Sequence, residues 1–360
     1  MDQTRIEQHD RGFYVQEEVN YQDKVIATIG LRGDKSSNNG DANQFYYYPK
    51  GSVAINLHEF GVGSGSVMSQ LKLRAAYGEA GNFALFGDKY TSLSAVIIDG
   101  NSGVTPLNKR GNPNIGPERQ KEFETGFDIG FMDGRLNFDF TYYQKGVSDL
   151  LLTAQVPSSS GFTTQVLNAA DMENKGVEMS LNWNIFSKGD FTWDLNTNWW
   201  KNNSKVTRLD IDAYTTGGFA DFLGQFMIKQ GYSPTSVIGV GPNPDIDLND
   251  DGTNTLQLFG NSEADFNFSF LNSLTYQNWS LSVLFHWKQG GDNINLTALL
   301  SDLSGTSADY DKIDWHSFRG GSYNGFEELW MFVLLFLEIF ILIIWSFIKK
   351  KEAGLKIYET

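Results

Sequence analysis

Residues 123–143, FETGFDIGFMDGRLNFDFTYY, consist of two stretches in which apolar and polar residues alternate, joined by a short segment that carries an Asp-Gly pair at 133–134. In the second stretch the apolar positions are Leu136, Phe138, Phe140 and Tyr142. A period of two residues is typical of a β-strand whose two faces meet different surroundings. An Asp-Gly pair between two such strands is a hairpin signal. This segment therefore predicts an antiparallel β-hairpin.

The same alternation recurs along the whole chain and gives ten strand candidates. They are residues 13–21, 25–31, 53–60, 67–77, 123–131, 136–143, 177–185, 191–199, 266–276 and 279–287. Short turns that carry residues 22–24, 133–134, 187–190 and 277–278 join four pairs of these strands. Long polar stretches follow at residues 32–52, 78–122, 144–176, 200–265 and 288–328. Structureless loops of that length are uncommon in a compact soluble domain.

Short turns on one side, long loops on the other and strands of about 9–11 residues are the layout of an outer-membrane β-barrel. The polar strand faces contain more Asn, Ser, Thr, Asp and Gly than Lys and Glu, which suits a water-filled lumen. We therefore expect an all-β fold, an antiparallel transmembrane β-barrel with short periplasmic turns and long extracellular loops, located in the cell outer membrane. The alternative is a β-sandwich glycan-binding ectodomain, either soluble or membrane-anchored, which explains the alternation but not the unequal connections.

Aromatic residues gather toward the ends of the strands. In a β-barrel such residues form girdles at the two boundaries between lipid and water. The candidates for these girdles are Tyr142, Tyr143, Trp183, Trp199, Trp200, Trp279 and Trp287. In the alternative fold they would belong to the core of a sandwich.

Composition and motifs exclude several classes of function. The chain has 360 residues, and its 28 Lys and Arg against 43 Asp and Glu give a formal net charge of −15, which argues against nucleic-acid binding. The absence of cysteine excludes disulfides, Cys-ligated metals and thiol nucleophiles. The sequence contains no nucleophile elbow, phosphate-binding loop or zinc-binding helix motif. We therefore expect neither catalytic residues nor enzyme activity.

Residues 247–252, DLNDDG, match the opening of a calcium-binding loop. Asp247, Asn249 and Asp251 are the expected ligands, because alternate oxygens converge on the ion where a glycine lets the chain turn. The twelfth position of such a loop needs a bidentate acid and is Leu258 here. The alternative interpretation is a solvated turn without metal.

Three carboxylates lie on the polar faces of predicted strands. Asp139, Glu178 and Asp194 are candidates to line a substrate path. The alternative is that they belong to a hydrated lumen wall without a specific role.

The C-terminal end differs from the rest of the chain. Residues 329–348 read LWMFVLLFLEIFILIIWSFI, and three lysines follow, which by hydropathy predicts a transmembrane helix. A single helix after a β-barrel makes no physical sense, because the two kinds of span satisfy their backbones differently. We therefore expect residues 1–328 to be a partial barrel and residues 329–360 to be an apolar tail that results from a frameshift or truncation. A genuine single transmembrane helix is the alternative.

Several motifs together resemble the SusC/RagA family of TonB-dependent outer-membrane transporters of the Bacteroidetes. The main ones are residues 71–82 (LKLRAAYGEAGN), 112–115 (NPNI), 122–126 (EFETG), 157–162 (PSSSGF) and 174–178 (NKGVE). A further match joins the 247–252 loop to the strand candidate 266–276. The resemblance covers most of residues 1–328 and none of residues 329–360.

The resemblance implies TonB-dependent import of a nutrient, commonly an oligosaccharide and in some relatives a peptide, through a barrel of about 22 strands. It implies two partners, a SusD-like surface lipoprotein that caps the barrel and the TonB complex that supplies energy. Family members place a plug and a TonB-contacting segment before the barrel, so the chain looks like a C-terminal barrel fragment that begins at an internal Met. The resemblance implies no cofactor, and calcium is considered only for the 247–252 loop.

Overall fold

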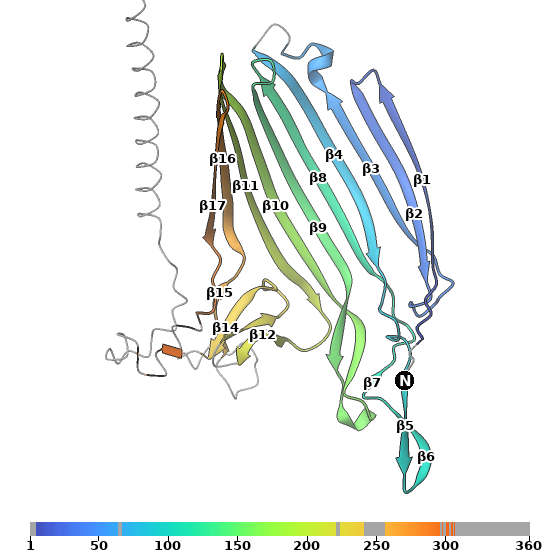
Figure 1. Ribbon diagram of the computed structural model, residues 1–360. Coiled ribbons are helices and arrows are strands. Elements are labelled where there is room, and N and C mark those ends of the chain that lie inside the picture. Colours follow the sequence, from blue (N-terminus) through green and yellow to red (C-terminus); the bar gives the residue numbers. More distant parts are fainter. Residues whose placement is uncertain are drawn as a thin grey trace, which may run out of the picture. The chain divides into compact units, whose positions relative to one another are not determined.

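The chain folds mainly into antiparallel β-strands. The computed structural model describes residues 5–63, 67–220, 224–240 and 256–295, together with residues 297, 300, 301, 304 and 306. Ten long strands lie side by side in one sheet, in the order in which they occur along the chain (Figure 1). They are β1 (Asp10–Tyr21), β2 (Val25–Ser36), β3 (Tyr46–Asn56), β4 (Met68–Asn82), β8 (Glu118–Phe131), β9 (Leu136–Gln155), β10 (Thr164–Lys188), β11 (Phe191–Leu209), β16 (Ala264–Tyr276) and β17 (Trp279–Gly290). This confirms the number and order of the ten predicted strands, although residues 57–60 of the candidate 53–60 form a 3-10 turn. One sheet in sequence order is not the pair of packed sheets of a β-sandwich.

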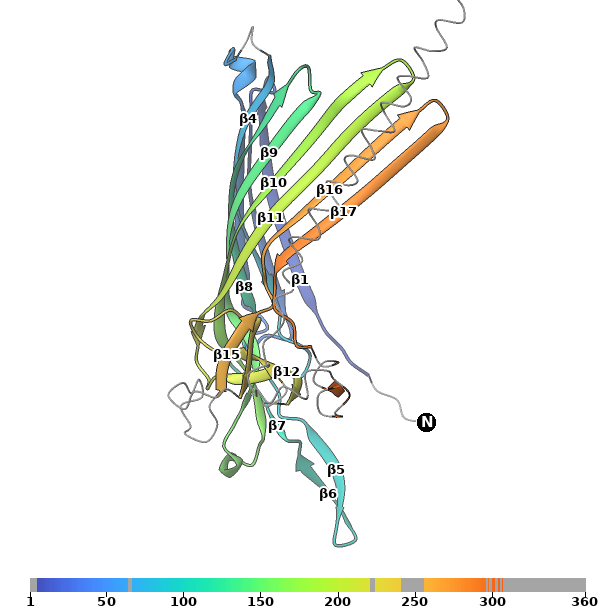
Figure 2. The same ribbon diagram turned by 90° about the vertical axis from the view of Figure 1, so that its left-hand side faces the viewer.

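Short turns join the strands at one end of this sheet, as predicted (Figure 2). In the turn between β1 and β2, Asp23 has a φ of 57° and its N–H donates to the Asn20 side chain at 2.8 Å. Gly134 supplies a φ of 80° between β8 and β9. The 3-10 turn η1 (Leu57–Phe60) follows β3 at the same end. Asp and Gly thus take left-handed conformations that tight turns require, and the apolar Met132 does so as well, with a φ of 55°.

Except for β3, which has 11 residues, the ten strands are longer than the predicted 9–11 residues, and β10 reaches 25. Residues 144–176, predicted as a long polar stretch between hairpins, are therefore mostly strand, because β9 continues to Gln155 and β10 begins at Thr164. The connection between them shrinks to residues 156–163, which include the 3-10 turn η2 (Ser158–Ser160).

The other long connections contain secondary structure that the alternation did not predict. β5 (Leu93–Ile98) and β6 (Asn101–Pro106) form a hairpin, and β7 (Lys109–Arg110) pairs in parallel with the start of β10. A separate four-stranded sheet consists of β12 (Tyr214–Ala220), β13 (Gly224–Ile228), β14 (Ser236–Val240) and β15 (Leu256–Asn261). All of these elements belong to the long-connection end of the main sheet.

On the apolar face, pairs of aromatic residues stand eight residues apart along four strands. The pairs are Phe13 and Tyr21, Phe123 and Phe131, Phe191 and Trp199, and Trp279 and Trp287. With about 3.4 Å per residue and a strand tilt of about 40°, eight residues cover roughly 20 Å, similar to the ~25 Å apolar band of outer-membrane barrels. Two boundaries of an apolar band are therefore marked along these strands.

Two residues predicted for the girdles lie on the polar face instead. Tyr143 follows Tyr142 and Trp200 follows Trp199, and neighbours in a strand point to opposite faces. The Tyr143 hydroxyl donates to Asn202 Oδ1 at 2.9 Å. The Trp200 ring centroid lies 5.6 Å from that of His286. The prediction that Tyr143 and Trp200 belong to the girdles is therefore wrong.

A small core fixes the connection between β4 and β8 onto β10. Ile115 is 1% exposed and packs against Ala84 and Val166. Asn168 on β10 accepts a hydrogen bond from the N–H of Gly116 and donates one to its carbonyl oxygen, each at 3.0 Å. The NPNI motif at 112–115 thus has a structural role at the far end of the sheet.

No helix in the described residues has the length and apolar character needed to cross a membrane. The predicted boundary at 328/329 and the apolar tail, residues 329–360, lie outside the described residues, so both stay predictions.

Candidate functional site

The polar face of the main sheet holds a hollow of about 660 Å³ that spans β4, β8, β9, β10 and β11. The residues that line it are Arg74, Glu122, Glu124, Asp139, Thr141, Tyr143, Lys145, Asn174, Glu178 and Asn202. The strand register brings them together, since Gly126 is the cross-strand partner of both Arg74 and Thr141, and Thr141 is also the partner of Glu178. The lining is almost entirely charged or hydrogen-bonding, so the hollow is a wet surface rich in donors and acceptors.

Arg74 neutralises two aspartates that face each other across neighbouring strands. Asp128 on β8 is the direct partner of Asp139 on β9, and like charges in such positions repel. Arg74 Nε donates to Asp128 Oδ1 at 3.0 Å, and its Nη2 donates to Asp139 Oδ2 at 2.7 Å. Lys72 Nζ lies 3.4 Å from Asp128 Oδ2. Two cations therefore compensate the two carboxylates on this wall.

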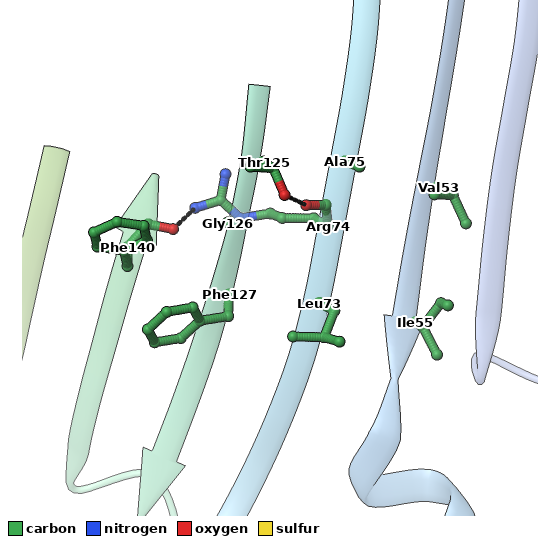
Figure 3. A pocket seen from close by; sticks show the side chains of 9 residues that line it. All are labelled: Val53, Ile55, Leu73, Arg74, Ala75, Thr125, Gly126, Phe127 and Phe140. Carbon is green, nitrogen blue, oxygen red and sulfur yellow. Dashed lines mark hydrogen bonds between the residues drawn. The ribbon is translucent and has the colours of Figure 1, made fainter. Parts of the chain in front are cut away.

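Gly126 provides the gap through which Arg74 reaches β9. The guanidinium passes over Gly126, where it donates to Phe140 O at 3.4 Å (Figure 3) and to Thr141 Oγ1 at 2.8 Å. A Cβ atom on Gly126 would lie 3.2 Å from Arg74 Cζ and 2.2 Å from Phe140 O. A side chain here would displace the arginine, so the glycine is a requirement of the ion-pair network.

The opposite, apolar face has its own hollow at the same strands, with a volume of about 390 Å³. Figure 3 labels its lining: Val53, Ile55, Leu73, Arg74, Ala75, Thr125, Gly126, Phe127 and Phe140. The Phe127 and Phe140 rings stack with centroids 5.2 Å apart. The Thr125 hydroxyl donates to the Arg74 carbonyl oxygen at 3.2 Å, which satisfies its hydroxyl proton on an otherwise apolar surface.

Tyr143, Asn202 and Glu263 form a second polar network beside the first. The Tyr143 ring lies over Gly176, where a Cβ atom would come within 2.3 Å of the ring. Asn202 Nδ2 donates to Ser204 Oγ at 2.8 Å and to the Glu263 carboxylate, and Glu263 Oε2 accepts the Ser204 N–H at 3.0 Å. Glu263, which precedes β16, therefore fixes the orientation of the Asn202 side-chain amide at the edge of the hollow.

Glu124 and Glu178 have no ion-pair partner within the part of the chain that the structure describes. Glu124 is the cross-strand partner of Tyr143, and Glu178 is the partner of Trp200. The wall thus presents carboxylates without a direct ion pair beside two aromatic side chains. It can attract cationic groups and donate or accept hydrogen bonds, whereas no group of His, Asp or Glu suited to a metal occurs among the described residues.

The structure brings together two of the three carboxylates predicted for a substrate path. Asp139 and Glu178 both line the polar hollow. Asp194 does not, because it lies near the short turns and accepts a hydrogen bond from Asn184 Nδ2 at 2.7 Å. The predicted calcium ligands Asp247, Asn249 and Asp251 lie outside the described residues.

Sequence reasoning missed Arg74, Tyr143 and Asn202. The available signal for Arg74 was a glycine, Gly126, on a neighbouring strand, but only the register shows that the two residues are partners. Tyr143 was assigned to the wrong face, and Asn202 fell in a segment predicted as loop.

Comparisons with known proteins agree with this architecture. The sequence profile of the family described as TonB dependent receptor-like, beta-barrel matches residues 1–226. TonB-dependent receptor P3 of Formosa agariphila is 28% identical over 319 residues, which cover 78% of this chain and 32% of that protein. TonB-dependent receptor SusC of Bacteroides thetaiotaomicron is 28% identical over 210 residues, 54% of this chain and 21% of that protein. This chain spans at most about a third of the length of these relatives.

A solved structure has the same fold. The structure of the RagAB peptide transporter superposes with a TM-score of 0.70 at 19% sequence identity, over 81% of this chain and 35% of the other. The RagAB peptide importer in the open-open state gives a TM-score of 0.66 at 18% identity, over 78% of this chain and 32% of the other. The resemblance to SusC/RagA transporters noted from the motifs is confirmed, and the chain belongs to the TonB dependent receptor-like β-barrel family of outer-membrane proteins.

Proposed function

We propose that the chain supplies part of the barrel wall of an outer-membrane nutrient importer that is driven by the TonB complex and takes up oligosaccharides. The observation that carries this proposal is the polar hollow of about 660 Å³ on the face of the sheet opposite the aromatic girdles. A transport path needs such a wet wall, because a solute that leaves water must keep its hydrogen bonds.

The side chains of the hollow favour a sugar. A sugar ring presents hydroxyl groups at its edge and a flatter apolar surface, and the wall offers amides, carboxylates and half-buried aromatic rings. Asn174 and Asn202 supply amide donors and acceptors in the hollow. Tyr143 supplies a ring in the hollow, and Trp200 supplies one beside it, opposite Glu178. Tyr and Trp combine a large apolar surface with a polar atom, which suits ligands of this mixed character.

A peptide substrate is the second candidate. Glu124 and Glu178 have no direct ion pair within the described part of the chain, and such carboxylates attract Lys and Arg side chains. A fold shared with the RagAB peptide transporter makes this candidate worth testing in parallel.

We infer two partners from the family, a SusD-like surface lipoprotein and the TonB complex. The first would contact the long-connection end of the sheet. There the β5–β6 hairpin exposes apolar side chains on one face, with Leu93 63%, Ile97 79% and Val104 66% exposed. Exposed apolar residues grouped in this way are typical of interaction surfaces.

The test is complementation of a strain that lacks the gene. The variant Trp200→Ala/Asn202→Ala removes an amide that lines the hollow and a ring beside it, opposite Glu178, and Asn196→Ala/Asn198→Ala is the matched control farther along the same face of β11. If each lost contact is worth about 1 kcal/mol, uptake of the preferred labelled oligosaccharides should fall roughly ten-fold or more in the first variant. The control should import them like the wild type, and a SusD-like lipoprotein should co-purify with both.

The outcomes separate the candidates. A loss of labelled peptide uptake with unchanged oligosaccharide uptake favours the peptide importer. If the first variant takes up both oligosaccharides and peptides like the wild type, the proposal that the hollow contacts the transported solute is wrong.

A further inference from the structure

Basic residues stand immediately beyond the aromatic residues on the apolar face of the sheet. Arg11 on β1, Lys35 on β2, Lys121 on β8 and Lys201 on β11 each lie ten residues from the strand end at the short turns. On each strand, the residue two positions nearer the short turn points to the same face as the cation. These residues are Phe13, Gly33, Phe123 and Trp199, respectively. The same order, aromatic then basic, therefore occurs on β1, β8 and β11.

The glycine on β2 is not an exception to this order. The Phe13 and Tyr47 rings lie on either side of Gly33, with centroids 6.4 Å apart. Both come within 3.1 Å of the position that a Cβ atom of Gly33 would occupy. Lys35 Nζ lies 5.1 Å from the centroid of the Phe45 ring. Aromatic side chains from the neighbouring strands thus stand beside Lys35 as well.

Two of the four cations have no partner within the described part of the chain. Arg11 and Lys201 are exposed and take part in no hydrogen bond or ion pair there. Lys121 is also exposed, and its cross-strand neighbour Glu79 is already bound by Arg119. The cations of the polar face differ, since Arg74 and Lys72 are both bound to aspartates. Exposed cations collected at one level of one face attract an anion from outside the protein.

The position of the four cations along the strands shows which layer of the membrane they contact. Ten residues at about 3.4 Å and a tilt of about 40° place the cations roughly 26 Å above the short turns. In bacterial outer-membrane barrels the short turns are periplasmic and the long connections extracellular. The cations therefore lie at the level of the lipid head groups of the outer leaflet, beyond its aromatic girdle. Lys35, Lys121 and Lys201 are separated by three strands each, or about 14 Å, so each can meet its own lipid.

We propose that Arg11, Lys35, Lys121 and Lys201 form a basic collar that binds the phosphate groups of the phosphorylated glycolipid of the outer leaflet, lipopolysaccharide. Aromatic rings below the cations, on the same or a neighbouring strand, lie against the upper acyl chains while the ammonium or guanidinium groups contact the phosphates. Charge complementarity selects this occupant, because each basic residue at an anionic membrane surface contributes about 1 kcal/mol and a neutral lipid offers no such gain.

The test compares three variants of the protein extracted from outer membranes in mild detergent. The collar variant is Lys35→Gln/Lys121→Gln/Lys201→Gln, and the charge-matched control is Lys24→Gln/Lys145→Gln/Lys188→Gln, which removes three lysines away from the collar. A third variant replaces the three collar lysines by Arg. Retained lipopolysaccharide is measured by mass spectrometry of its hydroxylated fatty acids, per mole of protein, across a series of NaCl concentrations.

The collar variant should retain about five-fold less lipopolysaccharide at low salt. The control and the Arg variant should match the wild type, and salt should lower retention by the wild type through screening. Heat-modified migration on gels checks that all variants are folded. Equal retention by the collar variant and the wild type overturns the proposal. Retention of phospholipid in place of lipopolysaccharide, or release by millimolar inorganic phosphate, overturns the choice of occupant.

Discussion

At the scale of single residues, Gly126 decides whether the aspartate pair on the polar face is neutralised. We expect Gly126→Val to disturb both the Phe140 carbonyl group and the Arg74 guanidinium, since a Cβ atom would fall 2.2 Å from Phe140 O and 3.2 Å from Arg74 Cζ. Asp128 and Asp139 would then face each other with less compensation. The expected loss is about 1–3 kcal/mol of unfolding free energy, measured by urea titration in detergent micelles.

Gly78→Val is the control for this prediction. Gly78 lies on β4, on the same polar face as Arg74, and nothing comes within 4 Å of the position that its Cβ atom would occupy. The two variants gain the same side chain, so equal stability of both would show that the gap above Gly126 has no energetic role.

The individual residues of the polar hollow were harder to predict from the sequence than the strands. Asp139 and Glu178 were found because alternation assigns a face to every strand residue. Tyr143 was misplaced because it was grouped with Tyr142 by residue type, although the alternation with Phe138 and Phe140 puts Tyr142 on the apolar face and Tyr143 on the other. Arg74 was missed because its role depends on a glycine 52 positions later that only the register brings opposite it.

At the scale of elements, the strands were predicted correctly but too short. The alternation exists where one face is apolar and the other polar, and it ends where both faces carry polar side chains, as at Gln144 and Lys145 on β9. The backbone pairing between β9 and β10 continues well beyond that point. The extended parts of β9 and β10 and the small sheet β12–β15 show no alternation of apolar and polar residues, so the sequence predicts them as loops.

The extended ends of β9, β10 and β11 are fastened by one arginine. Arg208 Nε and Nη2 donate to the two carboxylate oxygens of Asp171, each at 2.9 Å, and Nη2 also donates to Asp149 Oδ1 at 3.1 Å. The hydrogen bonds from Arg208 hold the pKa of Asp171 below its ordinary value of 3.8. A carboxylate whose pKa is lowered by folding stabilises the fold above its unfolded pKa, and this stabilisation is lost as the pH falls through the lowered value.

We therefore expect the ion pairs of Arg208, which hold the three strand ends together, to persist at pH 5 and to be lost only below about pH 4. The chain lacks cysteine, so a spin label on Thr207→Cys reports this region alone. The label should be immobile from pH 7 to 5 and become mobile in more acidic solution. Adding Asp171→Asn should make it mobile at every pH, whereas a label on Asn137→Cys near the short turns should not respond. A label at position 207 that is equally mobile at pH 7 and pH 3 would contradict the assignment.

At the scale of the whole molecule, the main sheet has two open edges. β1 and β17 stand at the ends of the strand order and are not paired with each other in the residues that the structure describes. Among the described residues, no further strand pairs with the outer side of β1 or of β17. In the hydrocarbon layer each backbone N–H or C=O group without a partner costs several kcal/mol, which is why spanning sheets close into barrels. The ten strands thus fit a membrane only when both edges are covered.

The 360 residues expressed alone and refolded in detergent should therefore associate through these edges. Light scattering after size exclusion should show dimers or larger species instead of a monomer, because edge pairing satisfies the exposed backbone groups. Amide hydrogen exchange gives an internal comparison. The amides of β9, paired on both sides by β8 and β10, should be protected in every species, and those on the free edge of β1 should gain protection only in the associated ones. A monodisperse monomer with protected β1 amides would show that residues outside the described part of the chain cover the edge.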